Sequence, residues 1–220
     1  MGPGMKIVVV GSGGREHALA HTFRRFGHEV VVTPGNAGIP GSVPDAPEDL
    51  VDGTDLFVVG PEVPLVDGLA DRLRAAGALV FGPGSDGAAL EGSKAWMKAL
   101  LDQAEVPTAR YATFTAGQQA DAFAFLDTMP LPYVIKTDGL AAGKGVVVTS
   151  DRDEAERAVH DYLSGSAFGH AGTTCVIEEG LIGPELSVFA ICDGTRAVLC
   201  GSAQDHKRVG DGDTGPNTGG

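Results

Sequence analysis

The chain has 220 residues, of which 43% are hydrophobic and 20% are charged, and its net charge is −13. This length suits two domains, and the composition is typical of a soluble α/β protein with a sizeable core. The acidic balance disfavours non-specific binding to nucleic acid or to an anionic membrane, because both need a basic surface. No apolar run approaches the roughly 20 residues that span a bilayer, and no leader precedes Met5, so we expect a cytoplasmic protein.

The chain opens with the pattern of a nucleotide-type βαβ unit. Lys6 to Val10 is predicted as a strand, Gly11 to Gly14 as a glycine turn and Arg15 to Phe26 as a helix. A dinucleotide fingerprint would have a third glycine where Glu16 stands, and an acidic residue after the next strand, which instead ends in Thr33-Pro34. The turn therefore favours a helix N-terminus facing a simpler phosphate over a dehydrogenase site. A glycine turn needed only for close packing is the alternative.

The remaining elements of the first domain, residues 1–104, follow from short apolar runs. They are strands at Glu29 to Thr33, Asp55 to Val59 and Val80 to Phe81, a helix from about Pro64 to Ala76, and a linking helix capped by Ser93. The loop Pro34 to Gly38 should meet the first turn at one sheet edge, and Gly60 to Glu62 follows the third strand. Glu62 could accept hydrogen bonds from a sugar diol there, or it could be a helix-entry acid beside the macrodipole.

The second domain, residues 105–183, is predicted as a small α+β lid. Its elements are helices at Gln118 to Asp127 and Asp151 to Leu163, a hairpin around Lys136 to Val148, and a strand at Thr174 to Glu178. Glycines let backbone N–H groups approach an anion closely, and lysines neutralise its charge, so the hairpin is a candidate phosphate cover. A mobile surface hairpin with solvated lysines is the alternative. The residues of the hairpin on which both interpretations depend are Lys136, Gly139, Gly143, Lys144 and Gly145.

The acidic segment after the last lid strand is a second candidate site. Glu178, Glu179 and Leu181, followed by Glu185, could hold an exocyclic amine and a ribose, or could form a solvated acidic turn. Residues 184–220 then begin with a hairpin around Asp193-Gly194 that has nothing left in sequence to cover its apolar face. We therefore interpret the chain as a fragment that ends within a further subdomain.

Metal sites and disulfides are not indicated. His17 and His21 lie four residues apart on a predicted helix, but no third ligand is evident nearby. Cys175, Cys192 and Cys200 are odd in number and have no Cys-x-x-Cys spacing, so we expect buried, reduced thiols.

Several motifs in order along the chain carry a family resemblance. They are Gly-Ser-Gly-Gly-Arg-Glu-His-Ala from Gly11, Pro-Gly-Asn-Ala-Gly from Pro34, Gly-Pro-Glu-Val-Pro-Leu from Gly60, Glu-Gly-Ser-Lys from Glu91, the hairpin from Lys136, Asp-His-Lys-Arg-Val-Gly-Asp from Asp205 and Asp-Thr-Gly-Pro-Asn-Thr-Gly-Gly from Asp213. Together they resemble the glycinamide ribonucleotide synthetase family of the ATP-grasp superfamily. The resemblance implies an α/β protein with an N-terminal Rossmann-like parallel sheet, an ATP-grasp lid and the start of a further, truncated subdomain.

The resemblance also implies a reaction and three groups of residues. ATP would phosphorylate the carboxylate of glycine, and the amine of 5-phosphoribosylamine would attack the glycyl phosphate, giving glycinamide ribonucleotide, ADP and phosphate. The residues expected to bind ATP are Lys94, Lys136, Gly139, Gly143, Lys144, Gly145, Glu178, Glu179, Leu181 and Glu185. Those expected to bind phosphoribosylamine are Gly13, Arg15, Asn36, Gly38 and Glu62. Those expected beside the reacting groups are Lys207, Arg208 and Asn217.

Two departures from the family pattern qualify the resemblance. Ser42 to Gly53 is a short acidic link where the family has a helical crossover. The protein ligands of magnesium or manganese are expected beyond Gly220, so we expect this polypeptide alone to be inactive or nearly so, with a mobile loop from Gly139 to Gly145. The alternatives are another ATP-grasp ligase or carboxylase with the same lid, and a nucleotide-binding module without chemistry.

Overall fold

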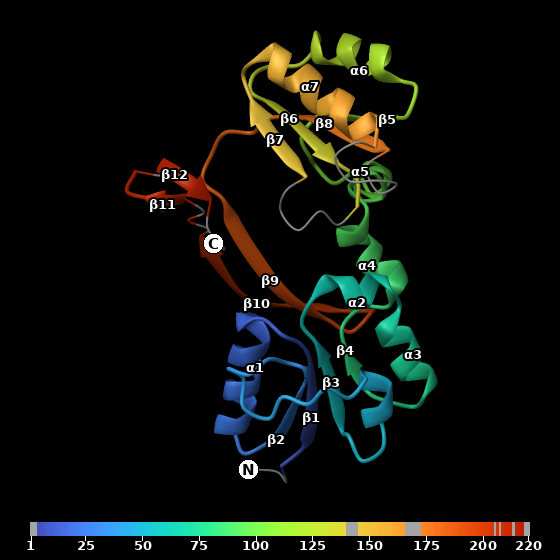
Figure 1. Cartoon of the computed structure of the whole chain (residues 1–220), viewed down its shortest axis with the longest axis vertical. Helices are drawn as coiled ribbons and strands as arrows, with labels where there is room; N and C mark the ends of the chain where they lie inside the picture. Colours follow the sequence, from blue (N-terminus) through green and yellow to red (C-terminus); the bar gives the residue numbers. More distant parts are fainter. Residues whose placement is uncertain are drawn as a thin grey trace. The chain divides into compact units, whose positions relative to one another are not determined.

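The structure is a computed structural model that describes residues 4–139, 145–165, 173–204, 206, 208–212 and 214–217. It divides into two compact units, Met1–Gly180 and Leu181–Gly220, and each is considered by itself. The first unit contains two four-stranded sheets with separate cores. The predicted division of this unit near residue 104 stays a prediction. Figure 1 shows the elements of both units.

The first sheet is parallel and has the strand order β2-β1-β3-β4. Its strands are β1 (Lys6–Gly11), β2 (Glu29–Pro34), β3 (Leu56–Val59) and β4 (Val80–Phe81). The valine-rich run of β1 is buried along almost its whole length, as expected for a central strand covered on both faces. All four strands were predicted from the sequence, and the structure confirms them to within a residue or so.

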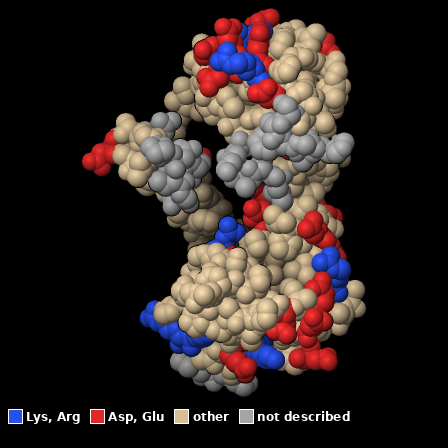
Figure 2. All heavy atoms as spheres, viewed as in Figure 1, with Lys and Arg blue, Asp and Glu red and all other residues tan. Residues whose placement is uncertain are grey.

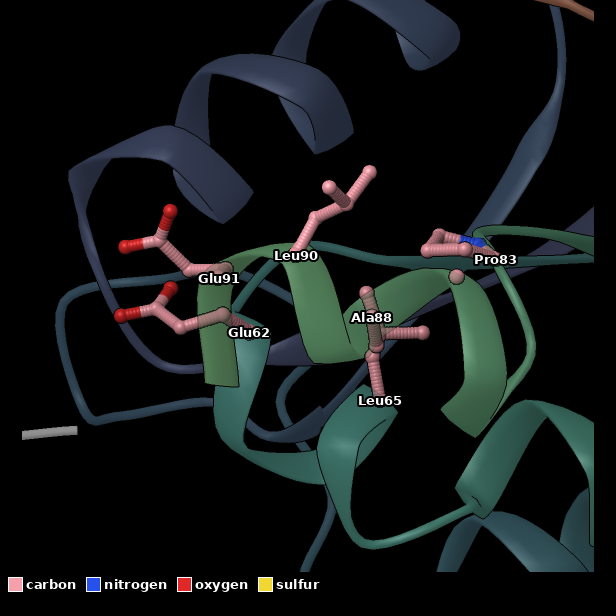
Figure 3. A pocket seen from close by; sticks show the side chains of 7 residues that line it. Glu62, Leu65, Pro83, Ala88, Leu90 and Glu91 are labelled. Atoms are coloured by element: carbon pink, nitrogen blue, oxygen red, sulfur yellow. The ribbon is translucent and has the colours of Figure 1, made fainter. Parts of the chain in front are cut away.

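Helices cover both faces of the first sheet. They are α1 (Gly14–Arg25), α2 (Glu62–Val66), α3 (Leu69–Ala75) and α4 (Ser85–Gly92), and a 3-10 helix, η1 (Pro47–Leu50), lies between β2 and β3. Alternate residues of β1 point to opposite faces, so that Val8 joins the core under α2 and α3 whereas Val9 joins the core under α1. The helices α2 and α4 border a small pocket (Figure 3).

Two expectations for this half of the unit were wrong. The single helix from Pro64 to Ala76 is two helices, because Gly68 adopts a left-handed conformation with φ of +78° and ends the first of them. The helix α4 was not expected at all. The link from Ser42 to Gly53, every residue of which is described, has η1 as its one helical element.

The second sheet is antiparallel and has the order β5-β8-β6-β7. Its strands are β5 (Tyr111–Thr115), β6 (Tyr133–Thr137), β7 (Val146–Thr149) and β8 (Thr174–Glu179), and its helices are α5 (Lys94–Gln103), α6 (Gln119–Leu126) and α7 (Arg152–Leu163). The lysine-flanked hairpin, both helices of the lid and the last strand are confirmed. The edge strand β5 was missed.

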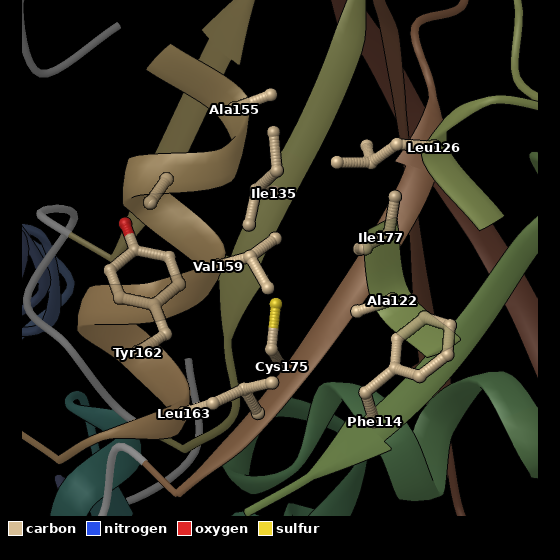
Figure 4. Packing of buried hydrophobic residues seen from close by; sticks show 11 residues of the cluster. Phe114, Ala122, Leu126, Ile135, Ala155, Val159, Tyr162, Leu163, Cys175 and Ile177 are labelled. Carbon is tan, nitrogen blue, oxygen red and sulfur yellow. The ribbon is translucent and has the colours of Figure 1, made fainter. Parts of the chain in front are cut away.

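The helices α6 and α7 bury one face of the second sheet (Figure 4). Ile135 and Ile177 project from the central strands into this core, where Leu126 and Val159 meet them. Asp151 caps α7, because its carboxylate accepts hydrogen bonds from the N–H groups of Asp153 and Glu154. The opposite face of the sheet carries polar residues, described below, and is contacted by α5.

The second unit consists of two antiparallel hairpins. They are formed by β9 (Leu186–Cys192) with β10 (Ala197–Gln204), and by β11 (Arg208–Gly210) with β12 (Thr214–Asn217). The first hairpin turns at Asp193 and Gly194, as predicted, and its glycine has φ of +92°.

The surface is predominantly acidic, in keeping with the net charge of −13. Figure 2 shows acidic side chains over α7, where basic side chains are interspersed, and on the side of the first sheet where α3 lies, whereas the side where α1 lies shows basic side chains. In the described part of the chain, none of the helices combines the length and the apolar character that crossing a membrane requires.

Candidate functional site

One face of the second sheet carries charged residues in place of an apolar core. Glu178 on β8 lies opposite Tyr111 on β5 and Val134 on β6. Lys136 follows Val134 by two residues and so projects from the same face. This is the face that α6 and α7 leave uncovered, and α5 reaches it through Lys98.

Lys98, Lys136 and Glu178 form a buried ion cluster. The ammonium of Lys98 lies 2.9 Å from Oε2 of Glu178, and that of Lys136 lies 2.9 Å from Oε1. The side chains of Lys98 and Glu178 are 3% and 6% exposed, whereas that of Lys136 is 25% exposed. Two ammonium groups share one carboxylate, so the cluster carries an excess positive charge that an anion would neutralise.

The two oxygens of Glu178 are not equally satisfied. Lys136 is close enough to Oε1 for an ion pair but is out of line for a hydrogen bond, and within the described residues this buried oxygen has no hydrogen-bond partner. A buried acceptor without a donor is costly. The oxygen could therefore accept a hydrogen bond from an N–H group of a ligand.

The mouth of the β6–β7 hairpin is anchored to the N-terminus of α5. The carboxylate of Asp138 accepts hydrogen bonds from Oγ of Ser93 at 3.0 Å and from the N–H of Ala95 at 3.1 Å. The ammonium of Lys94 donates to the carbonyl of Gly139 at 2.8 Å. These contacts place a second lysine beside the hairpin, whereas the N-terminus of α5 is already capped by the carboxylate of Asp138 and by Ser93.

Burial lowers the pKa of Lys94, and the nearby Asp138 carboxylate opposes that shift. Desolvation disfavours the charged form of a lysine, so an incoming anion would stabilise it. On the same face, the pKa of Tyr111 is shifted in the opposite direction. Its hydroxyl donates to Asp102 at 2.6 Å, and this hydrogen bond raises the pKa of Tyr111 to about 12.

Two exposed valines flank the ion cluster on the same face. Val146 pairs with Lys136 across the hairpin and Val148 pairs with Val134. They are 43% and 62% exposed, although valines of sheets are usually covered. The face thus combines an apolar strip with cations, which suits a ligand that has a flat base and a phosphate chain.

The other residues predicted to bind ATP are not part of the ion cluster. Glu179 points to the opposite face, where its carboxylate accepts a hydrogen bond from the N–H of Arg110 at 3.0 Å. The carbonyl of Gly145 accepts from the N–H of Thr137 at 2.9 Å. Leu181 and Glu185 belong to the second unit and are exposed there. Gly143 and Lys144 lie outside the described residues.

The residues predicted beside the reacting groups are described only in part. Lys207 lies outside the described residues. Arg208 and Asn217 pair in register between β11 and β12, at the open end of that hairpin. Their backbones are therefore neighbours, as a shared role would require.

A second group of predicted residues meets at the carboxyl edge of the first sheet. Arg15 donates to the carbonyl of Gly60 at 2.7 Å, Asn36 donates to the carbonyl of Ser12 at 2.7 Å, and Gly38 donates to Oδ1 of Asn36 at 2.7 Å. Loops after β1, β2 and β3 are thus tied together. This edge includes the point between β1 and β3 where strand order reverses, which is where open α/β sheets bind ligands.

Glu16 organises this edge, and the sequence analysis missed its role. Its side chain is buried, and Oε2 accepts a hydrogen bond from the N–H of Gly13 at 2.6 Å. A Cβ on Gly60 would lie 2.0 Å from Oε1 of Glu16, so a larger residue there would displace the Glu16 side chain. Glu16 stands three residues after the N-cap Gly13, at the position of the glutamate in a capping box, and this spacing is a signal that the sequence did contain.

Glu62 lies at the start of α2 and lines the pocket between α2 and α4. The pocket has a volume of about 190 Å³. Figure 3 shows the carboxylates of Glu62 and Glu91 close together, with Leu90 and Ala88 further along the pocket. Glu62 is therefore a helix-entry acid, and its expected contact with a sugar diol stays a prediction.

Family models match the whole described chain. The model described as phosphoribosylglycinamide synthetase, N domain, matches residues 5–91, and the model described as phosphoribosylglycinamide synthetase, ATP-grasp (A) domain, matches residues 92–220. A phosphoribosylamine–glycine ligase from Xanthomonas campestris pv. campestris is 51% identical over 98% of this chain and 53% of that protein. The corresponding ligase from Escherichia coli (strain K12) is 49% identical over 98% of this chain and 53% of its own length.

Solved structures agree with this assignment. A crystal structure of phosphoribosylamine–glycine ligase from Thermotoga maritima superposes with a TM-score of 0.82 at 32% identity, over 97% of this chain and 53% of that one. N5-carboxyaminoimidazole synthetase from Staphylococcus aureus, complexed with ADP, superposes with a TM-score of 0.70 at 18% identity, over 94% of this chain and 56% of that one. The second likeness concerns the fold alone. The chain spans about half the length of the curated relatives it matches.

Proposed function

The chain belongs to the phosphoribosylglycinamide synthetase family, and we propose from this that it supplies the ATP-binding and sugar-phosphate-binding parts of a phosphoribosylamine–glycine ligase. The proposed reaction uses ATP to phosphorylate glycine, and the amine of 5-phosphoribosylamine then displaces the phosphate to give glycinamide ribonucleotide. The observation that carries the proposal is the excess positive charge of the ion cluster beside the anchored glycine hairpin.

We assign the nucleotide to the charged face of the second sheet. Lys136 and Lys94 would neutralise its phosphates, and the exposed Val146 and Val148 would cover one side of the adenine. Oε1 of Glu178 would accept a hydrogen bond from the 6-amino group. Such a site would act by excluding water from the bound ATP and by neutralising the charge of its phosphates. Protein side chains contribute to phosphoryl transfer mainly in these ways.

We assign phosphoribosylamine to the carboxyl edge of the first sheet. Arg15 is exposed and uses one nitrogen on the carbonyl of Gly60, which leaves its other N–H groups for a phosphate. The N-terminus of α1 begins at the same turn and favours an anion. Asn36 and Gly38 complete this edge, and Glu62 would meet the ribose hydroxyls.

Magnesium or manganese is expected with ATP, but the described residues do not fit a metal ion. They contain no group of three or more His, Cys, Asp or Glu side chains arranged to bind one. No step is therefore assigned to a metal here. We propose a cytoplasmic protein that acts on small molecules and not on nucleic acid, and the charge of −13 supports this.

Calorimetric titration tests the two assignments separately. We expect the chain to bind adenylyl imidodiphosphate, an ATP analogue that is not hydrolysed, and to bind the stable product glycinamide ribonucleotide. Lys136→Met should weaken binding of the analogue by roughly tenfold, and Arg15→Met should weaken binding of the product by a similar factor, because each removes a charged contact to phosphate. Each substitution should leave the other ligand's affinity within about threefold of wild type.

A matched control is Arg157→Met, which removes an exposed cation from α7 on the far side of the second sheet. It should change neither affinity. Binding of the analogue without binding of the product would favour another ATP-grasp ligase. Binding that glycine does not influence would favour a nucleotide-binding module without chemistry.

A further inference from the structure

Lys98 is a buried charged residue to which neither the family motifs nor the proposed site gives a role. It lies in the middle of α5, and all of its contacts are internal to the second sheet and its connections. Besides its ion pair with Glu178, its ammonium donates to Oγ1 of Thr108 at 2.7 Å and to the carbonyl of Ala109 at 3.4 Å. It also lies 5.1 Å from the ring centroid of Tyr111. Its hydrogen-bonding capacity is thus used within the protein.

Lys136 pairs with the same carboxylate, but it differs from Lys98 in exposure and in hydrogen bonding. It is a quarter exposed, whereas Lys98 is 3% exposed. It contacts Oε1 without an aligned hydrogen bond. One lysine is therefore fixed to Glu178, and the other can turn toward solvent at little cost in hydrogen bonds.

We propose that Lys98 is a positioning residue that serves as the permanent counter-ion of Glu178 and so allows Lys136 to leave Glu178 for the phosphates of a bound nucleotide. This inference rests on the proposed nucleotide site. A buried carboxylate that loses its last cation is strongly destabilised, so with Lys136 as its one partner Glu178 would hold that lysine in place. With Lys98 present, Glu178 stays paired when Lys136 turns away, and Oε1 is uncovered for a donor on the base.

A pair of substitutions tests this division of roles. Lys98→Met keeps the length of the side chain and removes its charge, so Glu178 should retain Lys136 and the affinity for adenylyl imidodiphosphate should fall by roughly tenfold. Adding Glu178→Gln removes the charge that retains Lys136. The double variant should therefore bind the analogue at least about threefold more tightly than Lys98→Met, although it carries one more substitution.

Inorganic tripolyphosphate is the second probe, because it has no base and reports on the phosphate contacts of Lys136 and Lys94 without the base contact of Glu178. Its affinity should follow the same order, with a loss in Lys98→Met and a recovery in the double variant. A merely structural role for Lys98 predicts that the double variant binds both probes no better than Lys98→Met, and this result would overturn the inference. Equal binding by wild type and folded Lys98→Met would overturn it as well.

Lys98→Arg keeps the inference testable if Lys98→Met does not fold. It preserves the positive charge, and it should bind both probes within about threefold of wild type. A tenfold loss in Lys98→Arg with a native circular dichroism spectrum and an unchanged melting temperature would contradict the inference. Failure of wild type to bind either probe would instead contradict the proposed nucleotide site, so the two failures are distinct.

Discussion

Glu178 is the residue on which the electrostatics of the second sheet depend. It brings two lysines from different elements to one carboxylate, and its second oxygen remains without a hydrogen bond in the described structure. The sequence motif predicted roles for Lys136 and Glu178. It did not predict Lys98, because a lysine in an amphipathic helix is ordinarily solvated and its partner lies on a strand far along the chain.

Glu16 and Cys175 also show how far the setting of a single residue could be predicted from the sequence. Glu16 was noted as a departure from a glycine pattern, but its burial between Gly11 and Gly60 follows from packing that only the fold reveals. Cys175 was predicted to be a buried thiol, and the structure confirms that it is fully buried. Cys192 and Cys200, for which the same was expected, are exposed in the second unit.

Thiol titration should separate the three cysteines. Burial raises the pKa of Cys175 to about 12, and the thiolate is the reactive form, so Ellman's reagent should react quickly with Cys192 and Cys200 and with Cys175 only on unfolding. The variant Cys175→Ser should show the same fast reaction and lose the slow one. Fast reaction of all three thiols in the native chain would contradict the burial of Cys175.

The raised pKa also has a consequence for stability. The folded chain keeps the proton of Cys175 up to about pH 12, whereas the unfolded thiol loses it near 9.0. The folded state then binds more protons between these values, so the contribution of Cys175 to the free energy of unfolding is complete below the lower value and falls as the pH rises through the range. Cys175→Ser should remove this part of the pH dependence.

At the scale of elements, the predictions succeeded where the apolar pattern was strong. The valine-rich strands, the strands of the glycine hairpin and α7 all formed where they were expected. The strand β5 was missed although Tyr-Ala-Thr-Phe-Thr alternates as a strand should. The break between α2 and α3 was missed although Asp67-Gly68 is a turn signal, because the apolar positions on either side continue a single helical pattern.

Gly68→Ala tests the cause of that break. Gly68 has φ of +78°, and no atom lies closer than 3.7 Å to an added Cβ, so the penalty should come from the backbone conformation and not from a clash. We expect a loss of about 1 kcal/mol in the free energy of unfolding, measured by chemical denaturation.

Gly14→Ala is the matched control for Gly68→Ala. Gly14 is the first residue of α1, its φ is not positive, and an added Cβ would meet nothing within 4 Å. Its stability should be unchanged or slightly higher, because alanine restricts the unfolded chain. Equal effects of the two substitutions would show that the left-handed backbone of Gly68 does not cause the break.

At the scale of the whole molecule, the chain combines an acidic net charge with a local cluster of lysines. The net charge is −13, yet the ion cluster and the mouth of the β6–β7 hairpin gather Lys94, Lys98 and Lys136. Such local charge guides a phosphate-bearing ligand to one place while the global field repels polyanions. The sequence predicted this arrangement through the hairpin motif, and the fold adds the helix that completes it.

The most direct test of the proposed function is a chimera in which these 220 residues replace the matching part of the Escherichia coli relative. The chain aligns with 53% of that protein at 49% identity, so the junction can be placed within matched sequence. We predict that the chimera forms glycinamide ribonucleotide in a reaction that needs both ATP and glycine, and that Lys136→Met in the chimera abolishes it. A folded chimera that binds ATP but forms no product would contradict the proposed ligase function, as would full activity of its Lys136→Met variant.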